Sequence, residues 1–296
     1  MRPAHVAPLA LLLALASGAC SSSVPTRDLD APVGDRIVLF VPGVGGDNAT
    51  CAGLKRAIVR SADTDVRVHA WGMSGPLFVM NFRDPAVHAK AETELAQRIE
   101  TWSARNPRAQ IDLIGHSAGC GVILGALKRL PTDTNTPGGH RITFAGPPSQ
   151  GPRQWLRLFA IIVPHALLTP LGSSPPLTPA SPPALAARVR NVVLLAPSVS
   201  PGYDLSPALR HVAGRAHAFH SDRDVWHLKW RCSTSGTYDD VKTPAAGHAG
   251  FAATHPRLTQ HAYDPAWDAL GHDGGHTGSV AEDFVRTIVL PLLDAR

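Results

Sequence analysis

The sequence predicts an α/β fold with a mostly parallel central sheet and helices on both of its faces. Short, mostly apolar runs at residues 36–41, 109–114 and 189–197 have the composition of strands that are buried on both faces. Segments with helical spacing of apolar residues lie between these runs, and such alternation is typical of parallel sheets. About 260 residues follow residue 34, which is enough for one large hydrophobic core.

Residues 1–19 have the features of a signal peptide. Arg2 supplies a positive charge, and the apolar stretch at 6–19 is too short to span a bilayer. No later apolar stretch reaches the roughly 18 to 20 residues that a spanning helix needs. We therefore expect an exported bacterial protein.

The end of this segment, residues 16–23, resembles the lipobox of bacterial lipoproteins. In that motif a cysteine, here Cys20, is acylated and becomes the first mature residue; Ser17 departs from the pattern, because leucine is usual there. Acylation would hold the protein at a membrane surface facing the periplasm or the cell exterior. Simple secretion after Ala19 is the alternative. Residues 20–34, rich in serine, proline and aspartate, predict a flexible tether.

The charge pattern argues against a nucleic-acid partner. The net charge is +5, but the lysines and arginines are scattered along the chain. A nucleic-acid-binding protein would be expected to carry a basic stripe with interleaved aromatic residues. Nothing in the sequence predicts the oligomeric state.

The first predicted strand, residues 36–41, is followed by a glycine-rich turn at 42–47. Because glycine has no side chain, such a turn brings backbone N–H groups close to an anion. A phosphate-binding P-loop is excluded, because no Gly-Lys-Ser or Gly-Lys-Thr sequence follows. The next three elements are predicted to alternate helix, strand and helix, at residues 48–62, 66–70 and 85–106.

The segment Gly115-His116-Ser117-Ala118-Gly119 places a hydroxyl group where a buried strand passes into a helix. The glycines at 115 and 119 allow a sharp turn and a close approach of helix and strand. Ser117 is therefore predicted to stand exposed on a strained elbow, with the positive N-terminal end of the helix beside its oxygen. This position is typical of a nucleophile.

In this context the Gly-His-Ser-Ala-Gly string resembles the α/β-hydrolase superfamily, and the resemblance covers roughly residues 35–296. It implies an oxyanion hole made by the backbone amides of Val44, in the glycine turn, and Ala118, which follows the nucleophile. The superfamily often carries His-Gly-x-Gly-Gly at this turn; here Pro42 replaces the histidine while the glycines match.

The resemblance also implies an insertion that covers the active site. Residues 131–188 break the alternation of strands and helices, and they are rich in proline around one strongly apolar segment. We expect them to form a cap that shapes an apolar acyl or alcohol pocket. A surface insertion with one buried helix is the alternative.

The superfamily places its catalytic acid in the turn after a late strand. The run 216–224 has this character, and the resemblance implies Asp224 as the acid, with Asp222 and Asp204 as alternatives. An aspartate in such a turn also commonly caps the local backbone, which is the structural alternative for each of them.

The resemblance implies a catalytic base among the histidines near the end of the sequence. The superfamily carries it on the loop before the last helix, here predicted at 284–293 after a capping box at 279–282. The resemblance thus implies His276, with His272 as the alternative. We expect no metal site, because this pair would share a face only on a helix, and the two intervening glycines disfavour one.

The order Ser117, Asp224, His276 implies a serine hydrolase that cleaves carboxylic esters, carboxylesterase or lipase-like, through an acyl-enzyme and without a cofactor. The expected partner is a small-molecule or lipid ester, with the membrane surface reached through the lipid anchor. An acyltransferase on the same triad is one alternative. A surface binding protein whose chemistry has lapsed is the other.

The remaining cysteines give a weaker expectation. Cys51 and Cys232 are the first pair to consider for a disulfide, because Cys120 follows the elbow and is expected to pack as a small buried residue. Their spacing resembles no zinc site.

Overall fold

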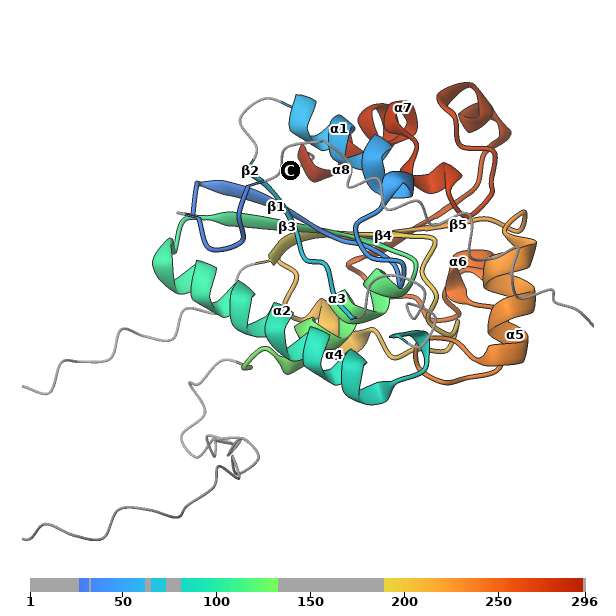
Figure 1. Cartoon of the computed structure of the whole chain (residues 1–296), viewed down its shortest axis with the longest axis horizontal. Coiled ribbons are helices and arrows are strands. Elements are labelled where there is room, and N and C mark those ends of the chain that lie inside the picture. The colour runs from blue at the N-terminus through green and yellow to red at the C-terminus, as the bar shows by residue number, and fades with distance from the viewer. Residues whose placement is uncertain (1–26, 32, 62–64, 73–80, 133–188, 295–296) are drawn as a thin grey trace, which may run out of the picture. The chain divides into compact units, whose positions relative to one another are not determined.

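A computed structural model describes residues 27–31, 33–61, 65–72, 81–132 and 189–294 of the chain (Figure 1). Apart from Thr132, these residues belong to one compact unit, which joins the chain up to Pro131 with the chain from Leu185 onward. The predicted signal peptide, Cys20 and almost all of the predicted cap lie outside the described residues. Among the described residues, no helix is long and apolar enough to cross a membrane.

Six strands form one sheet, and every neighbouring pair is parallel. The strands lie in the order β2-β1-β3-β4-β5-β6, with bounds Arg36–Val41 (β1), Asp65–Val68 (β2), Gln110–His116 (β3), Val189–Leu195 (β4), Ala216–His220 (β5) and Leu258–Ala262 (β6). The chain adds β2 on one side of β1 and then β3 on the other. In open parallel sheets, sites form beyond the carboxyl ends of the strands at such a reversal. The predicted parallel α/β fold class is confirmed.

Helices cover both faces of this sheet (Figure 1). The α-helices are α1 (Ala52–Arg60), α2 (Pro85–Arg105), α3 (Ala118–Arg129), α4 (Ser206–Leu209), α5 (Cys232–Ser235), α6 (Ala246–Ala249), α7 (Glu282–Phe284) and α8 (Leu290–Asp294). Two π-helical segments extend them: η3 (Val225–Arg231) runs into α5, and η6 (Val285–Val289) joins α7 to α8. Short 3₁₀ turns are η1 (Ala49–Cys51), η4 (Pro265–Leu270) and η5 (Gly278–Val280).

The two faces of the sheet carry separate cores, because side chains alternate along each strand. Leu39 of β1 belongs to the core that includes Leu95 of α2 and Ile123 of α3. Its neighbour Phe40 belongs to the other core, with Leu54 of α1 and Phe284 of α7. All six side chains are fully buried, so β1 and its sheet neighbours are held from both sides.

Local sequence explains where the longest helix begins. Asp84 precedes α2, and its carboxylate accepts hydrogen bonds from the amides of Ala86 and Val87 at 2.9 and 3.4 Å. Pro85 occupies the first turn, where its missing N–H costs nothing and its fixed φ suits a helix. The helix ends at Arg105, before the Asn106-Pro107 sequence that predicted its end.

The three described cysteines are buried free thiols. Cys51 lies in the core on the α1 face, whereas Cys232 lies in the core on the α3 face. The sheet separates the two sulfur atoms, so the expectation of a Cys51–Cys232 disulfide is wrong. Cys120 is fully buried, as expected.

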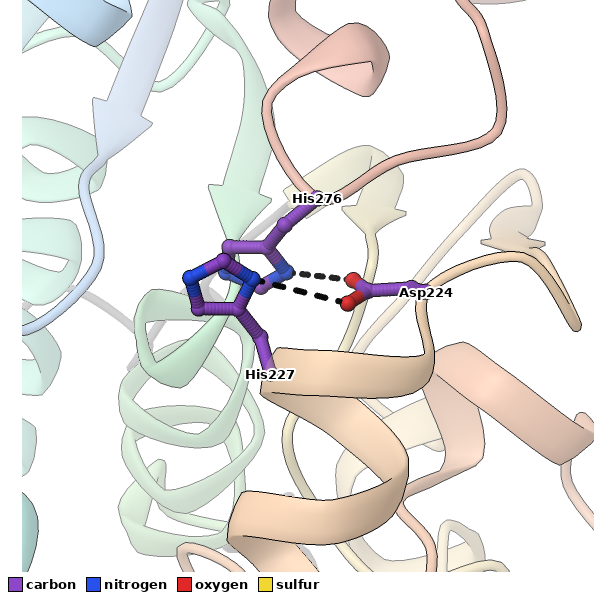
Figure 2. Close-up of side chains that lie close together, drawn as sticks. All are labelled: Asp224, His227 and His276. Carbon is purple, nitrogen blue, oxygen red and sulfur yellow. Dashed lines mark hydrogen bonds and ion pairs between the residues drawn. The ribbon is translucent and has the colours of Figure 1, made fainter.

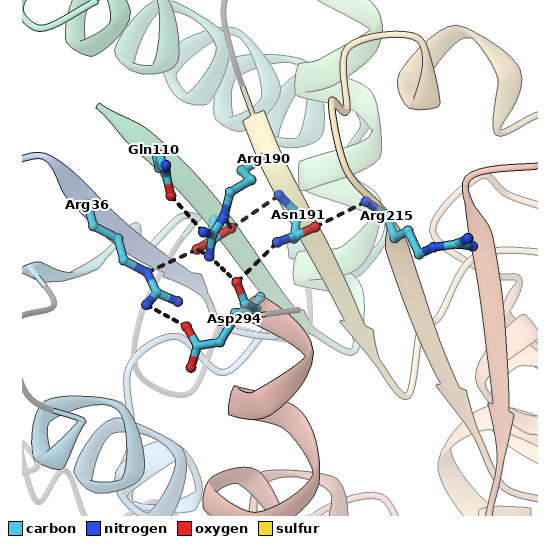
Figure 3. A network of polar contacts seen from close by, with 8 residues as sticks. Arg36, Gln110, Arg190, Asn191, Arg215 and Asp294 are labelled. Atoms are coloured by element: carbon cyan, nitrogen blue, oxygen red, sulfur yellow. Dashed lines mark hydrogen bonds and ion pairs between the residues drawn. The ribbon is translucent and has the colours of Figure 1, made fainter. Parts of the chain in front are cut away.

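A partly buried network of ion pairs lies at the end of the sheet opposite to Ser117 (Figure 3). Asp112 of β3 is fully buried and accepts from Arg190 at 3.1 and 2.9 Å and from the Asn191 amide at 3.2 Å. Arg36 lies 3.4 Å from the same carboxylate. Burial raises the pKa of Asp112, and hydrogen bonds and charge from Arg190, with the charge of Arg36, oppose the rise.

Removal of this carboxylate is expected to destabilise the fold strongly. In Asp112→Ala the two guanidinium groups lose their buried counter-charge, and we expect the free energy of unfolding in urea to fall by about 3 to 5 kcal/mol. The matched control is Asp283→Ala, which removes the exposed ion pair to Arg286 and should cost about 1 kcal/mol or less. Equal losses in the two variants would contradict a structural role for the network.

Candidate active site

Ser117 stands between β3 and α3 in a conformation that side-chain-bearing residues rarely adopt. Its φ is 55° and its ψ is −123°, and such a backbone costs of order 1–3 kcal/mol. A Cβ at Gly119 would lie 2.2 Å from the Val41 carbonyl oxygen, and one at Gly115 would lie 2.9 Å from the Cα of Cys120. Only glycine fits at these two positions, so the sequence around Ser117 maintains the strained elbow.

The structure brings Ser117, His276 and Asp224 into one hydrogen-bonded chain. His276 Nε2 lies 3.0 Å from Ser117 Oγ, and His276 Nδ1 lies 2.6 Å from Asp224 Oδ2. Ser117 follows β3, Asp224 follows the turn after β5, and His276 lies in the loop before η5. Each therefore extends from the carboxyl end of the sheet, where the reversal in strand order predicts a site.

The charge of Asp224 fixes how the histidine carries its proton. The carboxylate is 3% exposed, and burial favours its neutral form; polar interactions with His227 and His276 outweigh that effect and lower its pKa below the usual range. An ionised carboxylate accepts the Nδ1–H of His276. The Nε2 lone pair then faces the Ser117 hydroxyl, which is the arrangement that a general base needs.

His116, which the sequence analysis did not single out, holds the backbone of the histidine loop. Burial lowers the pKa of His116 to about 3, and the nearby His276 adds to the shift, so the ring is neutral at ordinary pH. Its Nε2 lies 3.0 Å from the His276 carbonyl oxygen. A carbonyl only accepts, so Nε2 carries the proton. Ser279 Oγ donates to the same oxygen at 3.2 Å.

Loss of the His116 donor is expected to loosen His276 without affecting substrate binding. In His116→Ala we expect kcat to fall by about a hundredfold with KM nearly unchanged, because an ångström-scale displacement of a base has effects of this size. His116→Gln retains an N–H donor and should recover much of the rate. The comparison is made by steady-state kinetics on a soluble ester, the substrate class that the sequence predicts. A loss confined to KM, or one equal in both variants, would contradict this positioning role.

The glycine turn after β1 lies directly against the elbow. A Cβ at Gly43 would lie 3.1 Å from Ser117 Cβ. The Gly43 carbonyl accepts from the Gly46 amide at 3.0 Å, and because N–H and C=O of one peptide point in opposite directions, this bond orients the Val44 N–H. Within the described part of the chain, neither the Val44 nor the Ala118 amide donates a hydrogen bond. Two such backbone amides near a nucleophile are available to donate hydrogen bonds to an oxyanion.

The alternative acids and base lie elsewhere. Asp222 is exposed, and its carboxylate makes no hydrogen bond or ion pair with a described residue. Asp204 accepts from the amide of Ser206, the first residue of α4, at 3.0 Å. His272 is buried, stacks on Trp267 and accepts from the Gly274 amide; burial lowers its pKa to about 4. The structure brings none of these three to Ser117.

A second histidine, also missed from the sequence, reaches the same carboxylate (Figure 2). His227 Nδ1 lies 3.7 Å from Asp224 Oδ1. Its ring stacks on that of His276, with centroids 4.6 Å apart and planes inclined by 21°. The only sequence signal was its position three residues after Asp224 on a helix, which turns both side chains to one side.

Comparisons with known proteins find similar structures but no similar sequences. No protein-family model and no curated protein matches the chain. Lipase B of Aspergillus fumigatus matches with a TM-score of 0.46 at 13% identity, covering 90% of this chain and 55% of the lipase. A hydrolase from Oleispira antarctica gives 0.43 at 9% identity, covering 92% and 100%. The esterase domain of a Rhodothermus marinus protein gives 0.39 at 12%, covering 89% and 88%.

The sheet and the elbow of this chain define its fold. A parallel sheet, helices on both of its faces and a serine on a strained strand-to-helix turn at the carboxyl end are the features of an α/β-hydrolase fold. The expected fold resemblance is confirmed.

Proposed function

We propose that the protein is a serine hydrolase that cleaves carboxylic esters, of the carboxylesterase or lipase-like class. One observation carries the proposal: Ser117, His276 and Asp224 form a continuous hydrogen-bonded chain that starts on a strained elbow. A solvent-facing structural serine needs neither the strain nor a histidine oriented by a buried carboxylate. Both are features of an activated nucleophile.

The proposed mechanism uses only residues of this chain. His276 Nε2 accepts the Ser117 proton while Oγ attacks the ester carbonyl, and Asp224 stabilises the imidazolium that forms. The amides of Val44 and Ala118 donate to the tetrahedral oxyanion, each contributing on the order of 3 kcal/mol to lowering the barrier. The imidazolium returns its proton to the departing alcohol. Water, deprotonated by His276, then attacks the acyl-enzyme and releases the acid.

A panel of p-nitrophenyl esters of increasing acyl length tests this function. We expect turnover, with product acid and alcohol in equal amounts. A second arm adds a primary alcohol as a competing acceptor: if transfer to it dominates over hydrolysis, the protein is an acyltransferase on the same triad. Absence of both turnover and labelling by a fluorophosphonate probe would show that the chemistry has lapsed.

We further propose that the ester substrate is met at an anionic lipid surface. Trp226 and Trp230 are 73% and 60% exposed, and they lie one turn apart on the helix that directly follows Asp224. Lys229, between them, is also exposed, and this helix carries no acidic side chain. Tryptophan with adjacent lysine suits the headgroup region of a membrane with anionic lipids. Acylation of Cys20 would retain the protein at the same surface.

Vesicle binding tests this surface independently of the anchor. The full chain carrying Cys20→Ser should sediment with phosphatidylcholine vesicles that contain phosphatidylglycerol, and Trp226→Ser/Trp230→Ser should reduce binding severalfold. Val59→Ser, which alters another exposed apolar residue, is the control. If acrylamide fails to quench the two tryptophans before lipid is added, another part of the chain covers them and the proposal is wrong.

A further inference from the structure

The proposed triad leaves one neighbouring side chain without a role. His227 is 42% exposed, whereas His276 and Asp224 are 12% and 3% exposed, so His227 is the solvent-facing member of the group. Figure 2 shows both imidazole rings presenting a nitrogen to the same carboxylate. The three ligand atoms lie within 4.8 Å of one another. Two imidazoles and one carboxylate, with one side open to water, are a donor set that suits Zn²⁺.

The distances require only a small adjustment to hold the ion. Tetrahedral ligands at about 2.1 Å from zinc are about 3.4 Å apart from each other. The present separations are 3.7 Å between His227 Nδ1 and Asp224 Oδ1, and 2.6 Å between His276 Nδ1 and Asp224 Oδ2. The first of these gaps must close by about 0.3 Å and the second must open by about 0.8 Å. The widest separation in the set is at most 4.8 Å and must close by up to about 1.4 Å, which rotation of the Asp224 carboxylate and the exposed His227 ring allows. A water molecule completes the fourth position.

We propose that Asp224, His227 and His276 form a zinc-binding site and that zinc reversibly switches the triad off. Zinc occupies the lone pair of His276 Nδ1, which is free only when that nitrogen carries no proton. The imidazole then carries its single proton on Nε2, where it faces Ser117. In this tautomer Nε2 donates to the hydroxyl and no longer accepts its proton. Zinc also binds the Asp224 carboxylate, which then no longer stabilises the imidazolium. The triad therefore loses both its general base and the carboxylate that supports it.

His227 makes this site different from a bare triad. A histidine and an aspartate alone provide two ligands, and zinc sites in proteins with an open position generally use three. His227 supplies the third from the helix that begins directly after Asp224, so its Cα is fixed relative to the carboxylate. His116 does not contribute, because its Nε2–H is committed to the His276 carbonyl.

Binding is tested first, in a form that needs no enzymatic activity. The full chain carrying Ser117→Ala, stripped of metal with EDTA and dialysed, is titrated with ZnCl₂ by calorimetry. We expect one zinc ion per chain with a micromolar dissociation constant. Adding His227→Phe, which keeps an aromatic ring on His276, should weaken binding at least about tenfold. His227→Gln serves as the second variant if the phenylalanine variant does not fold.

His255→Phe is the matched control. His255 precedes the amino end of β6, whereas Asp224 follows the carboxyl end of β5, and these strands are parallel. The control therefore removes a partly exposed histidine from the opposite end of the sheet, and zinc binding should not change. Equal binding in the His227 and His255 variants, or no binding at submillimolar zinc in the Ser117→Ala chain, would overturn the site.

The switching part rests on the proposed ester hydrolase function and is measured separately. Micromolar zinc should inhibit ester hydrolysis by the wild type, EDTA should restore it, and His227→Phe should require at least tenfold more zinc relative to its own metal-free rate. Zinc binding without inhibition would overturn the switch but not the site. If the chain hydrolyses no ester, the calorimetric result still decides the site, so the two proposals fail distinguishably.

Discussion

Ser117→Ala is expected to lower kcat for ester hydrolysis by about a millionfold. Removal of the nucleophile of a Ser–His–Asp triad has an effect of this size, and the residual rate comes from the oxyanion hole and binding. KM should change little, because the hydroxyl acts mainly in the transition state. The fold should persist, since alanine removes one oxygen atom from a site that the flanking glycines already shape. The measurement is kcat on a p-nitrophenyl ester together with labelling by a fluorophosphonate probe.

A second serine beside the elbow provides the control. Ser198 is 1% exposed, and its hydroxyl has no hydrogen-bond partner among the described residues. Its backbone amide donates to the Ser117 carbonyl at 3.3 Å, and alanine retains that bond. Ser198→Ala should therefore keep both labelling and turnover within a few-fold of wild type. Labelling that survives Ser117→Ala would show that the nucleophile is another residue.

The sequence predicted the centre of the fold better than its edge. Strands β1, β3 and β4 are buried on both faces, so their composition is mostly apolar and their positions were expected. Strand β6 was not predicted. Its residues, Leu258–Ala262, are partly or fully exposed at the edge of the sheet, and an edge strand that packs on one side only carries a weaker apolar pattern.

The same distinction explains which site residues sequence reasoning missed. Ser117 lies in a local motif whose neighbours reveal its conformation. His116 lies in that motif too, but its importance depends on a loop 160 residues later, whose carbonyl it contacts. His227 depends on the stacking of two rings from different elements. Contacts of this kind arise from tertiary packing, and no periodicity within one segment encodes them. The disulfide expectation was wrong for the same reason, since spacing does not tell on which face of the sheet a sulfur lies.

Asp224→Asn is expected to lower kcat by about ten thousandfold at neutral pH. The asparagine amide presents an N–H donor toward His276 Nδ1, which favours the tautomer with its proton on Nε2, and that nitrogen then fails as a base. The folded geometry should be retained, because the side chains have the same shape. The matched variant is Asp222→Asn, two residues away on the same turn, whose exposed carboxylate contacts no described polar group. It should retain wild-type kinetics.

The pH profile distinguishes an electrostatic role for Asp224 from a structural one. The pKa of Asp224 is lowered in the folded protein, so the carboxylate stays ionised at pH values where an ordinary aspartate takes up a proton. Its protonation therefore adds no decline in activity near pH 4. Its contribution to stability is complete above the ordinary pKa of an unfolded aspartate and is lost progressively as the pH falls from there through the lowered value. Unfolding should accordingly show no loss of stability from this group at mildly acidic pH. If Asp222→Asn instead abolishes turnover while Asp224→Asn does not, the acid lies on the solvent side of the turn and the hydrogen bond to His276 has no catalytic role.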